Sequence, residues 1–257
     1  MKKLLSLLAA SLLLGCVSVA DAGHTVDVAV INRSTGERLQ TWRYEGRLYV
    51  AGRPGDRYAV ELNNRSGGRI LTVLSVDGVN AISGQTAAAS QSGYVLDPGQ
   101  RSEIAGWRKS MDEVAAFYFT ALSDSYAART GRPDNVGVIG VAVYREYVEP
   151  RVDYEVQSLS KSAPAAPMAM PQGAGANRDE ATRAQPMEKR LGTGHGERIA
   201  APTQSTEFRR ASSRPSEVIA IYYDSHANLV ARGIIPAPHR PAQPQPFPGG
   251  FVPDPRG

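Results

Sequence analysis

The run Ile70-Leu71-Thr72-Val73-Leu74-Ser75-Val76-Asp77-Gly78 lies in the stretch that decides the fold, residues 56–107. Its first part is almost continuously apolar, which is typical of a strand covered on both faces. Asp77-Gly78 then closes a tight turn, because this dipeptide tolerates the positive φ angles that a two-residue hairpin needs. Just upstream, Tyr58, Val60 and Leu62 alternate with other residues, as in a half-buried strand. The stretch therefore predicts consecutive strands joined by turns.

Short strands of the same kind are expected on both sides of this stretch. We place them at residues 24–32, 39–44, 47–50, 79–82, 94–96, 102–107, 111–122 and 136–146. Turn sequences separate these strands, and no alternation of strands with long helices is visible. This pattern predicts an all-β fold, a single antiparallel β-sandwich that is Ig-like or has a similar Greek-key topology.

The composition divides the chain into an ordered part and polar segments. Residues 23–157 form the expected sandwich core. Residues 158–215 are rich in Ala, Pro, Gly, Ser, Arg and Gln, so we expect a disordered linker that cannot offset the entropy of ordering. Residues 216–235 predict a β-hairpin that docks on the core, since a lone hairpin is marginal in water. The proline-rich residues 236–257 predict an extended, disordered tail.

The N-terminus has the features of a signal peptide covering residues 1–22. Two lysines precede an apolar run at residues 4–14, which is too short to span a bilayer. An Ala-x-Ala pattern ending at Ala22 predicts cleavage there, so the mature protein would be periplasmic or secreted. Leu13-Leu14-Gly15-Cys16 also resembles a lipobox. The alternative is therefore an outer-membrane lipoprotein of the cell envelope, lipidated at Cys16.

Charge and cysteine content restrict the expected partners. The formal net charge of +4 becomes +3 once Lys2, Lys3 and Asp21 are removed with a signal peptide. So small a charge argues against nucleic acid as a partner. A membrane is expected as a partner only if Cys16, the single cysteine of the chain, carries lipid.

No catalytic, metal or cofactor pattern emerges from the sequence. The four histidines, His24, His195, His226 and His239, lack the spacing of a metal site. Asp224-Ser225-His226 contains the residue types of a hydrolase triad, but a triad is assembled from residues that are distant in sequence. The glycine-rich residues 192–198 lack the flanking strand and helix of a phosphate loop, which favours a flexible joint or a segment packed through His195. We therefore expect no enzyme activity and no cofactor.

Aromatic residues beside arginines give one candidate ligand site. Trp107 adjoins Arg108, and Tyr94 follows a small, polar loop at residues 83–93. Such loops often carry binding residues on a rigid scaffold, whereas aromatic residues in β proteins more often fill the core. A carbohydrate- or peptide-binding module built from Trp107, Arg108, Tyr94 and this loop is therefore the alternative function.

Several runs together resemble a set of exported proteins of Gram-negative bacteria that have no assigned activity. They are Ser75-Val76-Asp77-Gly78-Val79-Asn80, Ser92-Gly93-Tyr94-Val95-Leu96, Pro98-Gly99, Gly106-Trp107-Arg108 and Glu217-Val218-Ile219-Ala220-Ile221-Tyr222-Tyr223-Asp224. The resemblance covers residues 56–146 and 191–235. It implies a cell-envelope protein and assigns no catalytic residue.

The sequence thus predicts an exported, non-enzymatic cell-envelope protein that binds a protein or surface partner. An unrecognised hydrolase is a weaker alternative. The absence of a catalytic motif beside a well-patterned β domain is the observation behind this prediction.

Overall fold

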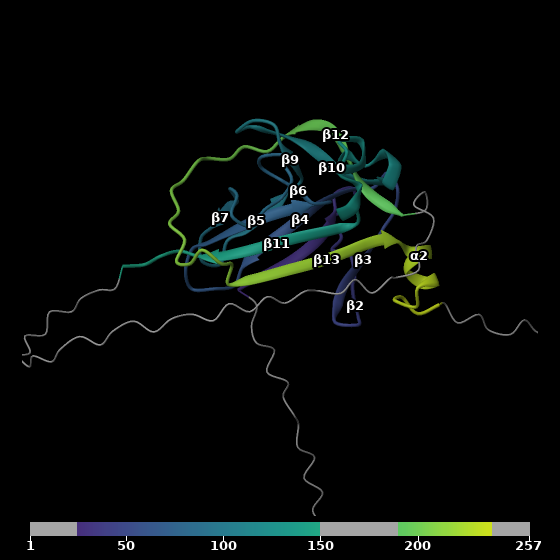
Figure 1. The fold of residues 1–257 in the computed structure, drawn as a ribbon, viewed down its shortest axis with the longest axis horizontal. Coiled ribbons are helices and arrows are strands. Elements are labelled where there is room, and N and C mark those ends of the chain that lie inside the picture. Colours follow the sequence, from purple (N-terminus) through teal and green to yellow (C-terminus); the bar gives the residue numbers. More distant parts are fainter. Residues whose placement is uncertain (1–24, 150–189, 238–257) are drawn as a thin grey trace, which may run out of the picture.

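The computed structural model describes residues 25–149 and 190–237, and these are mostly β-strands in two sheets (Figure 1). The first sheet has the order β1 (Val26–Asn32), β4 (Arg57–Asn64), β10 (Glu113–Ala121) and β12 (Leu191–Ala200), with β8 (Arg101–Ile104) paired to β4 and β9 (Gly106–Arg108) to β10. The second has the order β2 (Thr41–Tyr44), β3 (Arg47–Gly52), β13 (Glu217–Ser225), β11 (Val138–Arg145), β5 (Ile70–Val76) and β6 (Val79–Asn80), with β7 (Tyr94–Leu96) paired to β5. The short helices are η1 (Leu122–Asp124), α1 (Tyr126–Arg129), η2 (Pro133–Asn135) and α2 (His226–Ala231). The predicted all-β class is confirmed.

The decisive stretch folds as its pattern predicts. β5 pairs with β11 along one edge and with β6 and β7 along the other. It is buried along almost its whole length because Ile70 and Leu74 face the core between the sheets, whereas Leu71 and Val73 pack in the outer apolar cluster. Asp77 and Gly78 close the turn to β6 with φ angles of 52° and 72°. Side chains of both sheets, among them Leu74 and Phe117, meet in one apolar core. Burial of this shared core is the main force that holds the sheets face to face.

The second apolar block enters the middle of the second sheet. β13 pairs antiparallel with β11 on one side, with Ile221 opposite Ile139. On its other side it pairs parallel with β3, with Ile221 opposite Leu48. The prediction of purely antiparallel pairing is therefore wrong for this contact, and the sheet is mixed. A parallel neighbour requires a long connection, which the chain between β3 and β13 supplies.

The predicted disordered linker is wrong for the part that the structure describes. Residues 191–200 form strand β12, which pairs with β10 along the edge of the first sheet. Its glycines fit because neighbouring side chains occupy the space of a Cβ. A Cβ at Gly194 would overlap the ring of Tyr118, and a Cβ at Gly192 would lie 2.5 Å from that of Ser125. The glycines of β12 thus fit the shapes of neighbouring side chains, while Leu191, Thr193 and His195 supply the side-chain contacts of the strand.

After β12, residues 201–216 form an irregular strap that arcs past the ends of the strands, from the first sheet to the second, and leads into β13 (Figure 1). The strap forms backbone hydrogen bonds from Tyr147 N to Arg209 O and from Ala211 N to Arg145 O. Phe208 packs on the outer face of the sheet beside Leu71 and other apolar residues. This segment, too, was expected to be disordered, and the order arises from these contacts with the sheet.

The predicted hairpin at residues 216–235 has a strand as its first arm and a helix in place of its second. Ser225 ends β13 and caps α2, since its Oγ accepts a hydrogen bond from the backbone N–H of Asn228. Leu229 is fully buried beside Tyr49 and Ile234. The cap and this apolar contact make a helix the better solution for residues that otherwise read as a returning strand.

Several predictions lie outside the described residues. They are the signal peptide with Ala22 and Cys16, His24 and His239, most of the linker before Arg190, and the tail from residue 238 onward. Within residues 25–149 and 190–237, no helix is long and apolar enough to cross a membrane.

Candidate functional site

An open hollow of about 430 Å³ lies where α1 and β12 meet. It is lined by Asp124, Tyr126, Arg129, Thr130 and His195. The first four come from η1, α1 and the residue after it, and His195 comes from a strand that follows much later in the chain. The hollow therefore exists only because β12 joins the first sheet.

Local sequence fixes the two walls of this hollow. Ser125 caps α1, because its Oγ accepts a hydrogen bond from Ala128 N at 3.2 Å. β12 comes close to this cap, since Gly192 leaves room for the side chain of Ser125. Two residues beyond Thr193, on the same side of the strand, His195 pairs with Phe117 and is itself exposed.

Trp107 supports the hollow from below. Its side chain is only 2% exposed, and its ring contacts Phe117 edge-on at a centroid distance of 4.7 Å. The ring centroids of Tyr126 and His195 lie 4.9 and 6.3 Å from that of Trp107. The His195 ring is nearly parallel to the Trp107 ring, with an angle of 10° between their planes. Tyr126 and His195 are 5.2 Å apart. Together the three rings make an aromatic platform of which Tyr126 and His195 form the accessible part.

Positive charge surrounds this platform. Partial burial, together with the positive charges of Lys109, Arg129 and Arg198, lowers the pKa of His195 below its usual value. Arg198 forms an ion pair with Glu113 at 3.2 Å. Within the described part of the chain, no ion pair involves Arg129 or Lys109. The hollow thus contains an arginine that forms no ion pair within residues 25–149 and 190–237.

The predicted ligand residues only partly meet here. Trp107 lies in the core, as aromatic residues of β proteins most often do, and it approaches the hollow only from beneath, through the rings of Tyr126 and His195. The loop at 83–93 comes near, because Arg132 Nη1 donates a hydrogen bond to Gly84 O at 3.2 Å and the Arg132 guanidinium carbon lies 5.8 Å from the Tyr126 ring. Tyr94 and Arg108 contact each other, with the guanidinium carbon 5.9 Å from the ring, and they do not line the hollow.

Sequence reasoning did not identify Tyr126, Arg129 and His195 as site residues. The N-cap signal of a short helix was visible near Tyr126, and packing through His195 was one reading of the glycine-rich segment. Neither signal indicates that the two segments meet. That information lies in the pairing of β10 with β12, which joins residues far apart in sequence.

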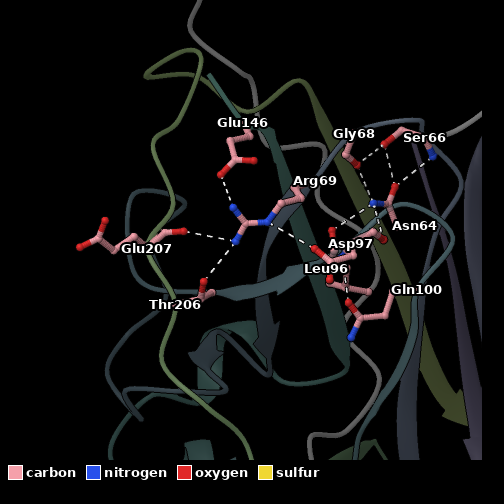
Figure 2. Close-up of polar contacts among 10 residues, drawn as sticks. All are labelled: Asn64, Ser66, Gly68, Arg69, Leu96, Asp97, Gln100, Glu146, Thr206 and Glu207. Carbon is pink, nitrogen blue, oxygen red and sulfur yellow. Dashed lines mark hydrogen bonds and ion pairs between the residues drawn. The ribbon is translucent and has the colours of Figure 1, made fainter. Parts of the chain in front are cut away.

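A second hollow of about 560 Å³ lies against the strap and is lined by Arg69, Glu146, Glu207, Phe208 and Arg209. Figure 2 shows that the Arg69 guanidinium is engaged within the protein. It forms ion pairs with Glu146 at 2.5 Å and Asp97 at 3.3 Å. It also donates hydrogen bonds to Thr206 Oγ1 at 3.2 Å and Glu207 O at 3.3 Å. We interpret this cluster as a structural tie between strap and sheet, not as a ligand site.

A buried polar network joins the two sheets. Asp77 is fully buried, and its carboxylate accepts hydrogen bonds from Tyr223 Oη at 2.5 Å, Gly137 N at 2.9 Å and Thr193 N at 2.7 Å. Thr193 Oγ1 is hydrogen-bonded to Tyr223 Oη at 2.7 Å and to Tyr58 Oη at 2.6 Å. Burial raises the pKa of Asp77 to about 6, although its hydrogen bonds act in the opposite direction. None of these residues lines either hollow, and we interpret the network as a tie between the two sheets.

Asp224, Ser225 and His226 form a helix-capping turn. Asp224 Oδ1 accepts hydrogen bonds from Leu191 N at 3.3 Å and from Asn228 Nδ2 at 2.8 Å. Asp224 thus joins the end of β13 to β12 and α2, and Ser225 caps α2. Among the described residues, no group of three or more His, Cys, Asp or Glu side chains could hold a metal ion.

Comparison of the chain with protein-family models, with curated proteins and with solved structures finds no match.

Proposed function

We propose that this chain is an exported, non-enzymatic cell-envelope protein that binds an envelope component in the hollow beside His195. In this proposal its two sheets form a β-sandwich of Greek-key type. Export rests on the N-terminal sequence pattern and on the resemblance to exported bacterial proteins. Where the protein resides, in the periplasm, outside the cell or on a lipid anchor at Cys16, follows from which N-terminal processing takes place.

The observation that carries the binding proposal is the combination of side chains in one open hollow. An aromatic platform, the Arg129 guanidinium, which has no ion pair among the described residues, and the Asp124 carboxylate face one space. Binding sites commonly pair an apolar or aromatic wall with a few polar groups that orient the ligand. In the second hollow the Arg69 guanidinium is already engaged by Glu146, Asp97 and the strap, and the Asp77 carboxylate is fully buried, so neither group is available to a ligand.

The sequence predicts a protein or surface partner. We propose more specifically that the part of this partner that binds is small enough to enter the hollow. The alternative prediction, a carbohydrate- or peptide-binding module, agrees with this geometry better than a flat protein-docking surface does. The aromatic support of the hollow comes from Trp107, one of the residues on which that prediction was based.

The test is a nuclear magnetic resonance titration of the full chain with a panel of envelope fragments, both saccharides and short peptides. The proposal predicts shifts of Tyr126, Arg129 and His195 signals by at least one fragment. It predicts no shifts at the strap around Phe208, which serves as an internal reference. Fragments that bind only elsewhere, or a panel without any binder at the hollow, would contradict the proposal.

A further inference from the structure

We infer that the hollow between α1 and β12 recognises an acidic sugar, a saccharide unit that carries a carboxylate or phosphate group. This inference rests on the proposed binding function and specifies its ligand. It follows from three kinds of group that face the hollow: a cation, a hydrogen-bond acceptor and an aromatic surface.

The cation is Arg129. Arginine binds carboxylate and phosphate oxygens through paired N–H donors, and such charge-assisted bonds are among the strongest in proteins. Arg129 lines the hollow and has no ion pair among residues 25–149 and 190–237. Lys109 adds positive charge near His195. A negatively charged group in the hollow would therefore meet the Arg129 guanidinium directly, with the charge of Lys109 nearby.

The acceptor is Asp124, which lines the same hollow. A carboxylate accepts hydrogen bonds and repels an anion. A ligand suited to both Arg129 and Asp124 therefore needs an anionic group at one end and hydroxyl donors at the other. A plain anion such as inorganic phosphate meets only the first requirement, whereas an acidic sugar meets both.

The aromatic surface is formed by Tyr126 and His195. The C–H groups on one face of a sugar ring carry partial positive charge and pack on the negative face of an aromatic ring. Trp107 holds His195 from beneath in a nearly parallel arrangement, with ring planes 10° apart. The platform is thus held in place before any ligand arrives, which reduces the entropy lost on binding.

Binding should also depend on pH through His195. The charged groups around it are Lys109, Arg129 and Arg198, with Asp124 as the acid of the same hollow, and Tyr126 and Trp107 are uncharged neighbours. An anion beside His195 favours its protonated form, so ligand binding should raise the pKa of this histidine. By linkage, the affinity for a carboxylate-bearing sugar, whose charge is constant above about pH 5, should rise as the pH falls through the titration of His195.

The experiment compares four probes with the full chain: glucuronate, glucose 6-phosphate, glucose and inorganic phosphate. The imidazole signals of His195 are followed by nuclear magnetic resonance from pH 5 to pH 8. We expect both acidic sugars to bind at least tenfold more tightly than glucose or inorganic phosphate. We also expect them to shift the titration midpoint of His195 upward.

Two variants locate the effect. Arg129→Gln should weaken binding of the acidic sugars by about tenfold to a hundredfold, as expected for a lost charge-assisted hydrogen bond. Arg145→Gln, an exposed arginine of β11, is the matched control and should leave binding unchanged. Amide spectra of both variants show whether the fold is intact.

The outcomes separate this inference from the broader proposal. Glucose that binds as well as glucuronate would overturn the requirement for an anion while leaving the hollow a binding site. Inorganic phosphate that binds as well as glucose 6-phosphate would overturn the requirement for a sugar. If no probe binds, or if the acidic sugars bind without moving the His195 midpoint and independently of Arg129, the inference is wrong.

Discussion

Asp77→Asn should change the stability of the protein in a way that depends on pH. The carboxylate is fully buried and accepts hydrogen bonds from Tyr223, Gly137 and Thr193, and among the described residues it forms no ion pair. Its pKa of about 6 in the folded protein lies above its ordinary value of 3.8. Between these two values the folded state binds more protons than the unfolded state, so this group makes the free energy of unfolding fall as the pH rises.

The magnitude follows from the size of the shift. A pKa difference of about 2 units corresponds to about 3 kcal/mol over the whole window. Lowering the pH from 7 to 5 protonates Asp77 in the folded state but hardly in the unfolded state. This raises the free energy of unfolding by about 1.3 kcal/mol. Asparagine cannot titrate, so the variant lacks this gain. The stability difference between wild type and Asp77→Asn should therefore shift by about 1.3 kcal/mol in favour of the wild type when the pH falls from 7 to 5.

The assay is urea unfolding followed by tryptophan fluorescence at pH 7, 6 and 5. Asp134→Asn, an exposed aspartate in η2, controls for the general effect of removing a carboxylate. Tyr223→Phe supplies a second check, because loss of its hydrogen bond to Asp77 should raise the pKa of that carboxyl further. A difference between wild type and Asp77→Asn that stays constant, or that shifts toward the variant at low pH, would refute the reasoning.

Three further substitutions test the structure elsewhere. Thr193→Val should cost about 1–3 kcal/mol in urea unfolding, because it leaves the buried Tyr58 hydroxyl without its hydrogen-bond partner; an unchanged midpoint would contradict this. Gly192→Ala should be strongly destabilising in thermal unfolding because its methyl group would lie 2.5 Å from Cβ of the buried Ser125 and 2.7 Å from Cγ1 of the buried Val136, whereas Gly67→Ala, with open space around it, should have little effect. Equal effects of the two would show that β12 is not packed as described. Arg69→Ala should speed hydrogen exchange at the amides of Tyr147 and Ala211, whose hydrogen bonds join strap and sheet, by about tenfold or more, and should leave the amides of β10 unchanged. Unchanged exchange at Tyr147 and Ala211 would mean that Arg69 does not hold the strap.

The parts of the fold that could be predicted are those whose own side chains carry the signal. The apolar run of β5 and its Asp77-Gly78 turn predicted a buried strand and a hairpin, and both are present. β12 could not be predicted in this way. Its glycines are selected by the shapes of Tyr118 and Ser125, which lie elsewhere in the chain. A strand that needs glycines to fit against its neighbours has the composition of a linker.

The same reason limits prediction of the site. The sequence indicates Trp107 as a candidate because a tryptophan beside an arginine can bind a ligand. Whether that tryptophan faces solvent or the core depends on the residues that cover it. Tyr126 and His195 cover it, and only the register of β10 with β12 brings His195 there. The predicted second arm of the hairpin is wrong for a related reason, since His226–Ala231 form helix α2. The capping bond of Ser225 and the buried contacts of Leu229 outweigh the preference of short apolar runs for strands.

The central claim is that two apolar blocks, separated by more than 40 residues between β11 and β12, form one cooperative core. Native-state hydrogen exchange of β13 tests it most directly, because this strand lies between β11 and β3. The account predicts that the slowest amides of β13 exchange only through global unfolding, with the same free energy as those of β5. Exchange of β13 through a lower-energy opening, while β5 stays protected, would contradict it.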